Sequence, residues 1–351
     1  MLPWLIVGGG PHGVHLAVHL RAAGVASHDL AIVDPHPELL ANWTECARRT
    51  GMTHLRSPSV HHLDMDPWAL RNFAAEWRPE RPCDEPFRAP YSRPALSLFA
   101  AHSRNVIERY GLRDRHEQAI VESIHPQPDT SVRVETSRGL LRAQRVVLAL
   151  GSGGGQVWPS WAEAIRDGKP GRIQHVFDPR FDLDTRVTVS SVAVVGGGIT
   201  GAQLALRLCR MGKRVTLLSR HRLRRRQFDS DPTWLGPAKM KPFARIRDPA
   251  QRRQAIDAAR HRGTMPAEVH RELRAAIRRR GLRSLRCKVA GCIALPDTLV
   301  LRHEFGSVEV DAVALATGFT GMPGESLLAT LRPEAGFRRA GCSSPLVDKQ
   351  L

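Results

Sequence analysis

The apolar and polar positions of this chain form one pattern twice. An apolar run at residues 5–7 passes into a glycine-rich turn at 8–13 and then into a stretch with helical spacing. A later apolar run, residues 192–195, passes into a turn of the same glycine spacing at 196–201 and again into a helical stretch. This order of strand, turn and helix predicts two βαβ units, each of which binds a dinucleotide.

The residue types of the first turn suit that chemistry. Gly8 permits the tight turn, Gly10 lets backbone N–H groups approach a pyrophosphate, and Gly13 lets the helix pack closely on the strand. The helix that starts at Pro11 and His12 would then direct its N-terminus at the phosphates.

The strand after each helix ends in different residues. Residues 31–33 lead to Asp34, where a carboxylate would accept hydrogen bonds from ribose hydroxyls. In the second unit Ser219 and Arg220 stand at this place, which removes the repulsion of an acid and offers an arginine to a 2′-phosphate. We therefore expect FAD or NAD in the first unit and NADPH in the second, with Arg220 as an ordinary surface arginine as the alternative. The residues expected at the second nucleotide are Gly196, Gly198, Ile199, Thr200, Gly201, Ser219 and Arg220.

Two further apolar runs complete the repeat. Residues 146–150 predict a buried strand that ends at Gly151, where the backbone can approach a ligand closely or can serve as an exit loop. Residues 312–316 predict its counterpart, ending at Thr317 and Gly318.

The segment after Asp34 has no clean period. It contains Trp43, Met52 and the mixed run 53–63, which favours a loop lining a cofactor, with a plain surface excursion as the alternative. Helical spacing is expected over residues 68–77, 95–110 and 249–280, the last an arginine-dense and solvated segment.

Composition narrows the class of protein. At 351 residues the chain is expected to form two domains. Its formal net charge of +18 favours anionic phosphorylated cofactors and a compositional preference for arginine over a nucleic-acid partner, because no nucleic-acid-binding motif accompanies it. With no signal peptide, no apolar run of the ~20 residues that span a bilayer and no disulfide framework among six cysteines, a cytoplasmic protein with no membrane contact is expected.

The whole layout resembles the class B flavin monooxygenases, in particular the lysine and ornithine N-hydroxylases. This resemblance implies an α/β fold with two Rossmann-like dinucleotide-binding domains, the NADPH domain inserted into the FAD domain. The expected boundaries are 1–160 for the first part of the FAD domain, 161–186 for a linker, 187–292 for the NADPH domain and 293–351 for the return to the FAD domain. The resemblance to these hydroxylases rests on Gly8, Gly10, Gly13, Trp43, Met52, Gly196, Gly198, Gly201 and the run 316–319.

The resemblance also implies a reaction. In that family NADPH reduces the flavin, molecular oxygen adds to give a C4a-(hydro)peroxyflavin, and a nucleophilic amine attacks its distal oxygen. We accordingly expect N-hydroxylation of a small amine or amino acid, with a homo-oligomer left open. Because the cofactor carries the hard chemistry, no catalytic side chain is assigned. No metal is expected either, since His12, His15 and His19 share a helix face without a nearby acid or cysteine to complete a shell.

Some residues depart from the family pattern. Gly171 and His175 keep part of the Baeyer–Villiger fingerprint, but Lys169 stands where its phenylalanine would be, so that reaction is not supported. The segment after Met52 does not reproduce the family's substrate-binding loop, and the sequence stops at residues 345–351, where similar proteins continue into a strand and a helix beside the flavin.

Three alternatives remain from the sequence. Cys287 and Cys292 have the CxxxxC spacing of dithiol flavoprotein reductases, although those enzymes carry the pair after the first nucleotide unit. A non-catalytic dinucleotide-binding protein is the second alternative. DNA binding through the arginine-rich helix is the third.

Overall fold

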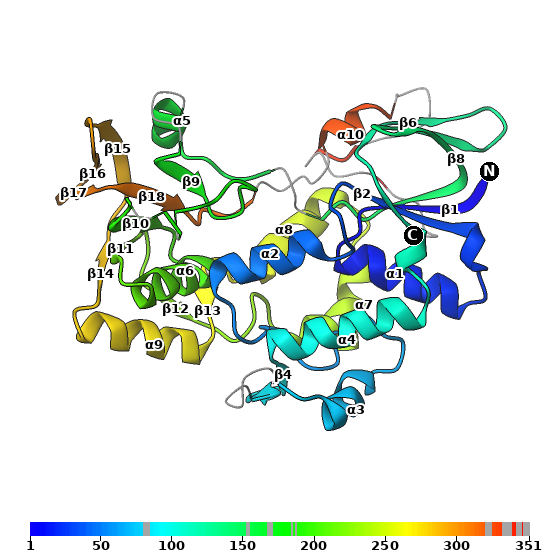
Figure 1. Cartoon of the computed structure of the whole chain (residues 1–351), viewed down its shortest axis with the longest axis horizontal. Coiled ribbons are helices and arrows are strands. Elements are labelled where there is room, and N and C mark those ends of the chain that lie inside the picture. Colours follow the sequence, from blue (N-terminus) through cyan, green and yellow to red (C-terminus); the bar gives the residue numbers. More distant parts are fainter. Residues whose placement is uncertain are drawn as a thin grey trace. The chain divides into compact units, whose positions relative to one another are not determined.

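The computed structural model describes residues 1–79, 85–151, 155–166, 171–183, 185–186, 188–319, 325–331, 339–341 and 346. It divides into two compact units (Figure 1). The first unit comprises Met1–Glu45, Thr53–Gly155 and Gly321–Leu351, and the second comprises Cys46–Met52 and Gln156–Thr320.

The first unit is built on a six-stranded sheet in the order β5-β2-β1-β8-β7-β6. The pairs β5–β2, β2–β1 and β1–β8 are parallel, and β7 and β6 continue the sheet antiparallel. Its elements are β1 (Leu2–Val7), α1 (Pro11–Ala22), β2 (Leu30–Asp34), α3 (Ala69–Glu76), β3 (Phe87–Arg88), β4 (Arg93–Pro94), α4 (Leu96–Arg109), β5 (His116–Gln118), β6 (Val121–Pro126), β7 (Val132–Thr136), β8 (Gly139–Leu148) and α10 (Glu325–Ala329).

Alternation along β1 explains how this sheet is covered on both faces. Ile6 packs with residues of α1 and α4, whereas Leu5 and Val7 pack on the other face with residues of β6–β8 and with Leu327 of α10. A strand that is apolar at every position therefore belongs in the middle of the sheet. Helix α2 (Ala41–Thr50) then leads along the chain from the first unit into the second.

The second unit is built on a fully parallel sheet in the order β14-β11-β10-β18-β9. Helices α6 and α9 supply the apolar residues on one face, and α5 with the antiparallel sheet β15–β17 supplies them on the other. Its remaining elements are α5 (Ser160–Arg166), β9 (Ile173–His175), β10 (Ser191–Val195), α6 (Ile199–Arg210), β11 (Arg214–Ser219), β12 (Arg224–Arg225), α7 (Pro237–Arg245), α8 (Pro249–Ala259), β13 (Thr264–Met265), α9 (Ala267–Arg278), β14 (Leu282–Arg286), β15 (Val289–Ala294), β16 (Leu299–His303), β17 (Gly306–Val310) and β18 (Ala312–Leu315).

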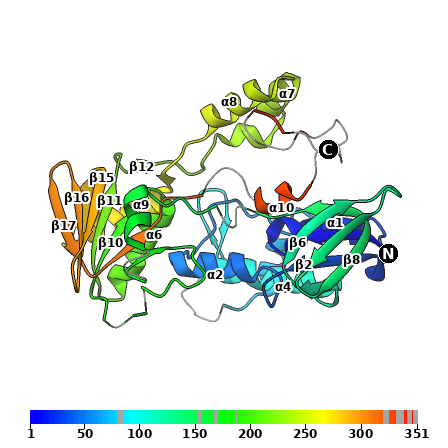
Figure 2. The same cartoon turned by 90° about the horizontal axis from the view of Figure 1, so that it is seen from above.

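Residues 227–262 form an arm of the second unit. Its helices α7 and α8 contain no buried residue and stand apart from the sheet (Figure 2). The arm closes on itself at its base, where the backbone N–H of His261 donates to the carbonyl of Asp229 at 2.6 Å and Arg260 pairs with the carboxylate of Asp229 at 3.1 Å.

The predicted α/β fold with one unit inserted into the other is confirmed, but several sequence-based expectations need correction. The chain does not return to the first unit at residue 293, because β18 pairs with β10 in the middle of the second sheet. The expected linker 161–186 contributes β9 to that same sheet. The expected helix over 249–280 is divided into α8 and α9, because Gly263 takes a φ of +67° and Pro266 caps the second helix.

The segment expected to be irregular also differs, since α2 occupies residues 41–50. Leu40 and Gly51, both with positive φ, bound this helix. In the described part of the chain, none of the helices combines the length and apolar character needed to span a bilayer.

Candidate functional site

The first glycine turn lies at the point where the strand order of the first sheet reverses. Strand β1 lies between β2, which follows it through α1, and β8, which pairs on its other side. At the carboxyl ends of these strands the Gly8 N–H donates to the carbonyl of Val33 at 2.8 Å, and the Ala149 N–H donates to the carbonyl of Val7 at 2.8 Å. Open α/β sheets bind their ligands at such a point.

The second glycine turn repeats this geometry bond for bond. Strand β10 lies between β11 and β18. Gly196 N–H donates to Leu218 at 2.9 Å, and Ala316 N–H donates to Val195 at 2.8 Å. The structure therefore contains two equivalent nucleotide-type turns, one in each unit.

Four glycines are required by close backbone contacts. A Cβ on Gly8 would lie 2.4 Å from the carbonyl oxygen of Ala149, and one on Gly196 would lie 2.3 Å from that of Ala316. A Cβ on Gly13 would lie 1.8 Å from the oxygen of Gly8, and one on Gly201 would lie 2.1 Å from that of Gly196. Gly13 and Gly201 thus let each helix pack against the turn after its strand, as the sequence predicted for Gly13, whereas Gly8 and Gly196 let each turn pass close to the residue after the neighbouring strand.

Gly10 has a different role. A Cβ there would meet no atom within 4 Å, and the backbone angles, φ −75° and ψ −177°, are ordinary for any residue. The glycine therefore leaves free space at the N-terminus of α1, where Pro11 begins the helix and no side chain caps it. Open backbone N–H groups at a helix N-terminus, with room for a ligand, fit a pyrophosphate. His12 lies exposed beside this space.

Asp34 is bound into the first turn. Its Oδ2 accepts the Gly9 N–H at 2.7 Å, and its Oδ1 accepts the His36 N–H at 2.9 Å and lies 2.7 Å from the His36 ring nitrogen Nδ1. A carboxylate has about four acceptor sites, so it can still accept a hydrogen bond from a ribose hydroxyl.

The equivalent residues of the second unit are placed differently from each other. Ser219 is buried, and its hydroxyl donates to the carbonyl of His221 at 2.8 Å. Arg220 is exposed at the end of β11, so it is the member of the pair that is accessible to a ligand. Ile199 and Thr200 begin α6, partly exposed, as the motif requires.

Two residues beside the second turn were not found from the sequence. A Cβ on Gly198 would lie 3.5 Å from the Cα of Gly263, and a Cβ on Gly263 would lie 2.6 Å from Nε2 of His221. In the second turn Gly263 therefore lies next to Gly198, whereas no atom lies within 4 Å of the equivalent Cβ position at Gly10 in the first turn. Gly263 is 62 positions after Gly201 in the numbering, so no local pattern indicates the contact.

The other candidate residues lie at strand ends or in α2. Gly151 and Gly318 follow β8 and β18 with φ of +61° and +90°. Thr317 donates its hydroxyl to the carbonyl of Val157. Trp43 lies in α2 with its ring centroid 5.1 Å from that of Phe99, and Met52, two residues beyond the end of α2, is partly buried. Lys169, residues 152–154, residue 345 and residues 347–351 lie outside the described residues.

His175 ends β9 inside an aromatic cluster. It is fully buried, its Nδ1 accepts the Phe177 N–H at 3.3 Å, and its ring centroid lies 6.4 Å from Trp158 and 6.0 Å from Phe319. Burial lowers the pKa of His175 to about 4, so the ring is neutral at physiological pH.

Neither cysteine of the CxxxxC pair has the character of a reactive thiol. Burial and the charge of Glu304 raise the pKa of Cys287, and burial raises the pKa of Cys292 to about 11. Because the thiolate is the reactive form, both thiols are expected to react slowly. Over the described ranges, no group of three or more His, Cys, Asp or Glu side chains has the arrangement of a metal site.

Similar proteins were found by family and by structure. The family model described as pyridine nucleotide-disulphide oxidoreductase matches residues 5–265. No curated protein sequence matches the chain.

Among solved structures, the reduced form of an ornithine hydroxylase from Pseudomonas aeruginosa matches over 100% of this chain and 90% of its own, at 16% identity and a TM-score of 0.73. An L-lysine 6-monooxygenase from Pseudomonas syringae matches over 99% of this chain and 88% of its own, at 17% identity and a TM-score of 0.72. A bacillithiol disulfide reductase from Staphylococcus aureus matches over 99% of this chain and 85% of its own, at 16% identity and a TM-score of 0.60. At these identities the matches show a shared fold.

Proposed function

The chain belongs to the pyridine nucleotide-disulphide oxidoreductase family, and from that premise we propose that it is an FAD- and NADPH-dependent monooxygenase that N-hydroxylates a small amine or amino acid. In this proposal the first unit holds FAD and the second holds NADPH. Molecular oxygen and the amine are the other reactants.

The observation that carries the proposal is the duplicated turn. The bonds of Gly8 and Ala149 recur at Gly196 and Ala316, each at a strand-order reversal. A protein with one such turn needs one dinucleotide, whereas two turns in one chain fit a reaction in which one cofactor reduces another. The resemblance in fold to hydroxylases of ornithine and lysine favours N-hydroxylation over disulfide reduction, and so do the raised thiol pKa values of Cys287 and Cys292.

The roles of the chain's own residues follow from their positions. When bound, the flavin supplies oxygen activation and NADPH supplies the hydride. Gly10 and the N-terminus of α1 would hold the FAD pyrophosphate through backbone N–H groups, and Asp34 would accept from the ribose. Gly198 with Ile199 and Thr200 would hold the pyrophosphate of NADPH in the same way. Arg220 is the sequence-based candidate for its 2′-phosphate.

The visible absorption spectrum of the purified protein tests the cofactors. We expect a flavin spectrum, either as isolated or after addition of FAD, that bleaches when NADPH is added without oxygen. A protein that stays colourless with added FAD contradicts the monooxygenase. Stable NADPH binding without any flavin would instead indicate a non-catalytic nucleotide-binding protein.

The substrate class needs a second assay. Lysine, ornithine and cadaverine are suitable probes, because proteins of this fold act on them. We expect at least one small amine to raise oxygen consumption and to yield a hydroxylamine in proportion to the NADPH oxidised. NADPH oxidation alone is no support, because an uncoupled flavoprotein makes peroxide without touching an amine. A panel of small amines that yields no hydroxylamine contradicts N-hydroxylation.

A further inference from the structure

Two imidazole rings meet on the outer side of α1. His15 and His19 are four positions apart in the sequence, so their side chains lie on the same face of the helix, one turn from each other. The Nε2 atoms of the two rings lie 3.0 Å apart, and the ring centroids lie 4.4 Å apart with the planes at 84°. His19 is exposed and His15 is partly buried, so an ion from the solvent can reach the pair.

The second nitrogen of His15 is fixed by the backbone. Its Nδ1 lies 3.0 Å from the carbonyl oxygen of Leu63. A carbonyl oxygen only accepts hydrogen bonds, so Nδ1 carries the proton, and the neutral ring keeps its lone pair on Nε2, which faces His19. Histidines that bind metals in proteins have this arrangement, in which one ring nitrogen donates to a carbonyl or carboxylate and the other is the ligand.

The carbonyl that orients His15 is itself held in place. Leu63 is 3% exposed and belongs to the same hydrophobic core as Val14 of α1. The next residue, Asp64, is buried, and its carboxylate accepts a hydrogen bond from Arg109 of α4. The His15 ring is therefore oriented before any ion binds, which lowers the entropic cost of binding.

The separation of the two Nε2 atoms fits a shared metal ion. Imidazole nitrogens bind such ions at about 2.0–2.1 Å, and two nitrogens 3.0 Å apart then enclose an angle of about 95° at the ion. This angle is close to the right angle of the tetragonal sites of Cu²⁺ and Ni²⁺, and it is narrower than the tetrahedral angle that Zn²⁺ prefers.

We propose that His15 and His19 together bind a divalent ion of the Ni²⁺ or Cu²⁺ type through their Nε2 atoms, with water in the remaining positions. Without the ion, Nε2 of His19 donates to Nε2 of His15. When the ion binds, that proton moves to Nδ1 of His19 and the lone pair of Nε2 becomes a ligand. The lack of a nearby acid or cysteine argued against a metal on this helix face, whereas the geometry of the pair and the bond to Leu63 favour one. The inference requires no nucleotide, so it is independent of the proposed function.

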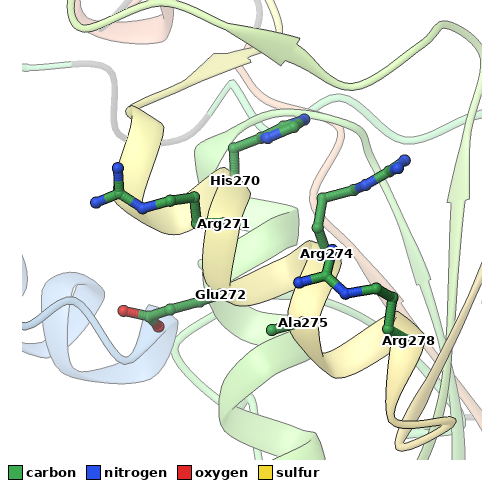
Figure 3. Close-up of a pocket in the computed structure, with 6 residues that line it drawn as sticks. All are labelled: His270, Arg271, Glu272, Arg274, Ala275 and Arg278. Atoms are coloured by element: carbon green, nitrogen blue, oxygen red, sulfur yellow. The ribbon is translucent and has the colours of Figure 1, made fainter.

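His270 of α9 provides a matched comparison. It is also a partly buried helix residue, but Arg274 stands four positions after it. Figure 3 shows His270 and Arg274 extending to the same side of α9. Burial, and then the positive charge of Arg274, lower the pKa of His270. The same positive charge repels a divalent cation, so we expect no ion at His270.

Calorimetric titration of the untagged full-length protein with Ni²⁺ tests the site. Ni²⁺ is the probe because it does not oxidise the free cysteines as Cu²⁺ does. We expect His15→Ala and His19→Ala each to weaken Ni²⁺ binding at least about tenfold, and the control His270→Ala to change it by less than about twofold. Mg²⁺ is expected not to compete, because it prefers oxygen ligands.

The variant His19→Gln separates metal binding from hydrogen bonding. Its amide can still donate to Nε2 of His15, but it replaces the imidazole ligand, so we expect it to lose Ni²⁺ as His19→Ala does. Ni²⁺ should also raise the melting temperature of the wild type and leave that of His19→Gln unchanged. Because His19 is exposed, both of its variants are expected to melt near the wild type without metal.

Three results would overturn the inference. The first is a wild-type protein that binds no Ni²⁺. The second is Ni²⁺ binding of wild-type strength in His19→Ala or His19→Gln, which would place the ion elsewhere. The third is a loss in His270→Ala as large as the loss in His19→Ala, which would mean that single surface histidines bind the ion without chelation.

Discussion

The carboxylate of Asp34 accepts the backbone N–H of Gly9 at 2.7 Å, which ties the end of β2 to the turn after β1. The same side chain has acceptor capacity left for a ribose. It therefore belongs to the fold of the turn and to the proposed FAD site at once.

Replacing Asp34 by alanine should impair both. We expect a loss of about 1–3 kcal/mol in the stability of the first unit, because the Gly9 N–H loses its partner in a partly buried turn, and a weaker hold on FAD. Chemical denaturation and the flavin content of the purified protein measure the two effects. Asp29→Ala, at an exposed ion pair with His28, is the control and should change neither. Undiminished flavin content in Asp34→Ala would contradict its place in the site.

Gly10 and Gly13 form a matched pair for separating binding from folding. Gly13→Ala should destabilise the first unit by more than about 2 kcal/mol, because its Cβ would lie 1.8 Å from the Gly8 oxygen. Gly10→Ala should fold with a stability near that of the wild type but should bind FAD more weakly, because the methyl group would fill the space at the N-terminus of α1. Thermal denaturation and FAD titration test both variants. If Gly10→Ala keeps full FAD affinity, that space does not hold the cofactor.

His102 should make the first unit sensitive to acid. Burial, and then the nearby His62, lower the pKa of His102 to about 4 from 6.5. As the pH falls below 6.5 the unfolded chain gains this proton first, so stability should fall by up to about 3 kcal/mol between pH 6.5 and pH 4 and then level off. In His102→Leu the urea denaturation midpoint should depend less on pH over this range, whereas substitution of the exposed His28 by leucine should leave its pH dependence unchanged. An unchanged slope in His102→Leu would mean that other groups cause the loss.

A second acid-dependent step should follow at lower pH. Burial alone would raise the pKa of Asp64, but hydrogen bonds from Arg109 and from the Met65 N–H outweigh it, so the pKa lies below its ordinary value. The stability that this carboxylate contributes is complete above about pH 4 and should be lost as the pH falls further. Asp64→Asn should remove this lower step, and because the charge of Asp64 raises the pKa of His102, it should also shift the His102 step to lower pH. Denaturation midpoints between pH 4 and pH 2 test this, and persistence of the lower step in Asp64→Asn would contradict it.

The cysteine pair should be dispensable. With the pKa values of Cys287 and Cys292 raised, we expect the double serine variant to oxidise NADPH at a rate within about twofold of the wild type. Cys209→Ser is the control, because its thiol donates to the Gly281 carbonyl and lies outside the pair. Loss of turnover only in the double variant would favour a dithiol reductase.

The sequence was informative where function depends on local spacing. The two glycine turns, the strands before them and Asp34 are each encoded within about thirty residues, so their geometry could be predicted. Helices of the first unit were predicted as well, since α4 lies inside the expected range 95–110. The strands expected near 146–150 and 312–316 lie beside the turns as β8 and β18. Only β18 is buried as expected: β8 ends at Leu148, which is exposed, and its neighbours Val146 and Val147 are half-buried.

What the sequence did not reveal depends on contacts between distant segments. Strand β18 pairs with β10, so the residues from 293 to the end of β18 belong to the second unit. The local sequence around β18 does not indicate with which sheet the strand pairs. The position of Gly263 beside Gly198 is likewise set by where the arm returns to the sheet. Ser219 lies under the turn, where a Cβ on Gly197 would be 2.0 Å from its hydroxyl oxygen, and residue type alone does not indicate this placement.

The closed base of the arm has an evolutionary consequence. Because Asp229 and His261 are hydrogen-bonded to each other, residues 230–260 can be lengthened, shortened or replaced without opening the sheet that carries the second turn. The arm also buries no residue of α7 or α8, so selection on its sequence is free of the demands of a core. Descendants of this chain can therefore diverge in the arm while both glycine turns stay constant.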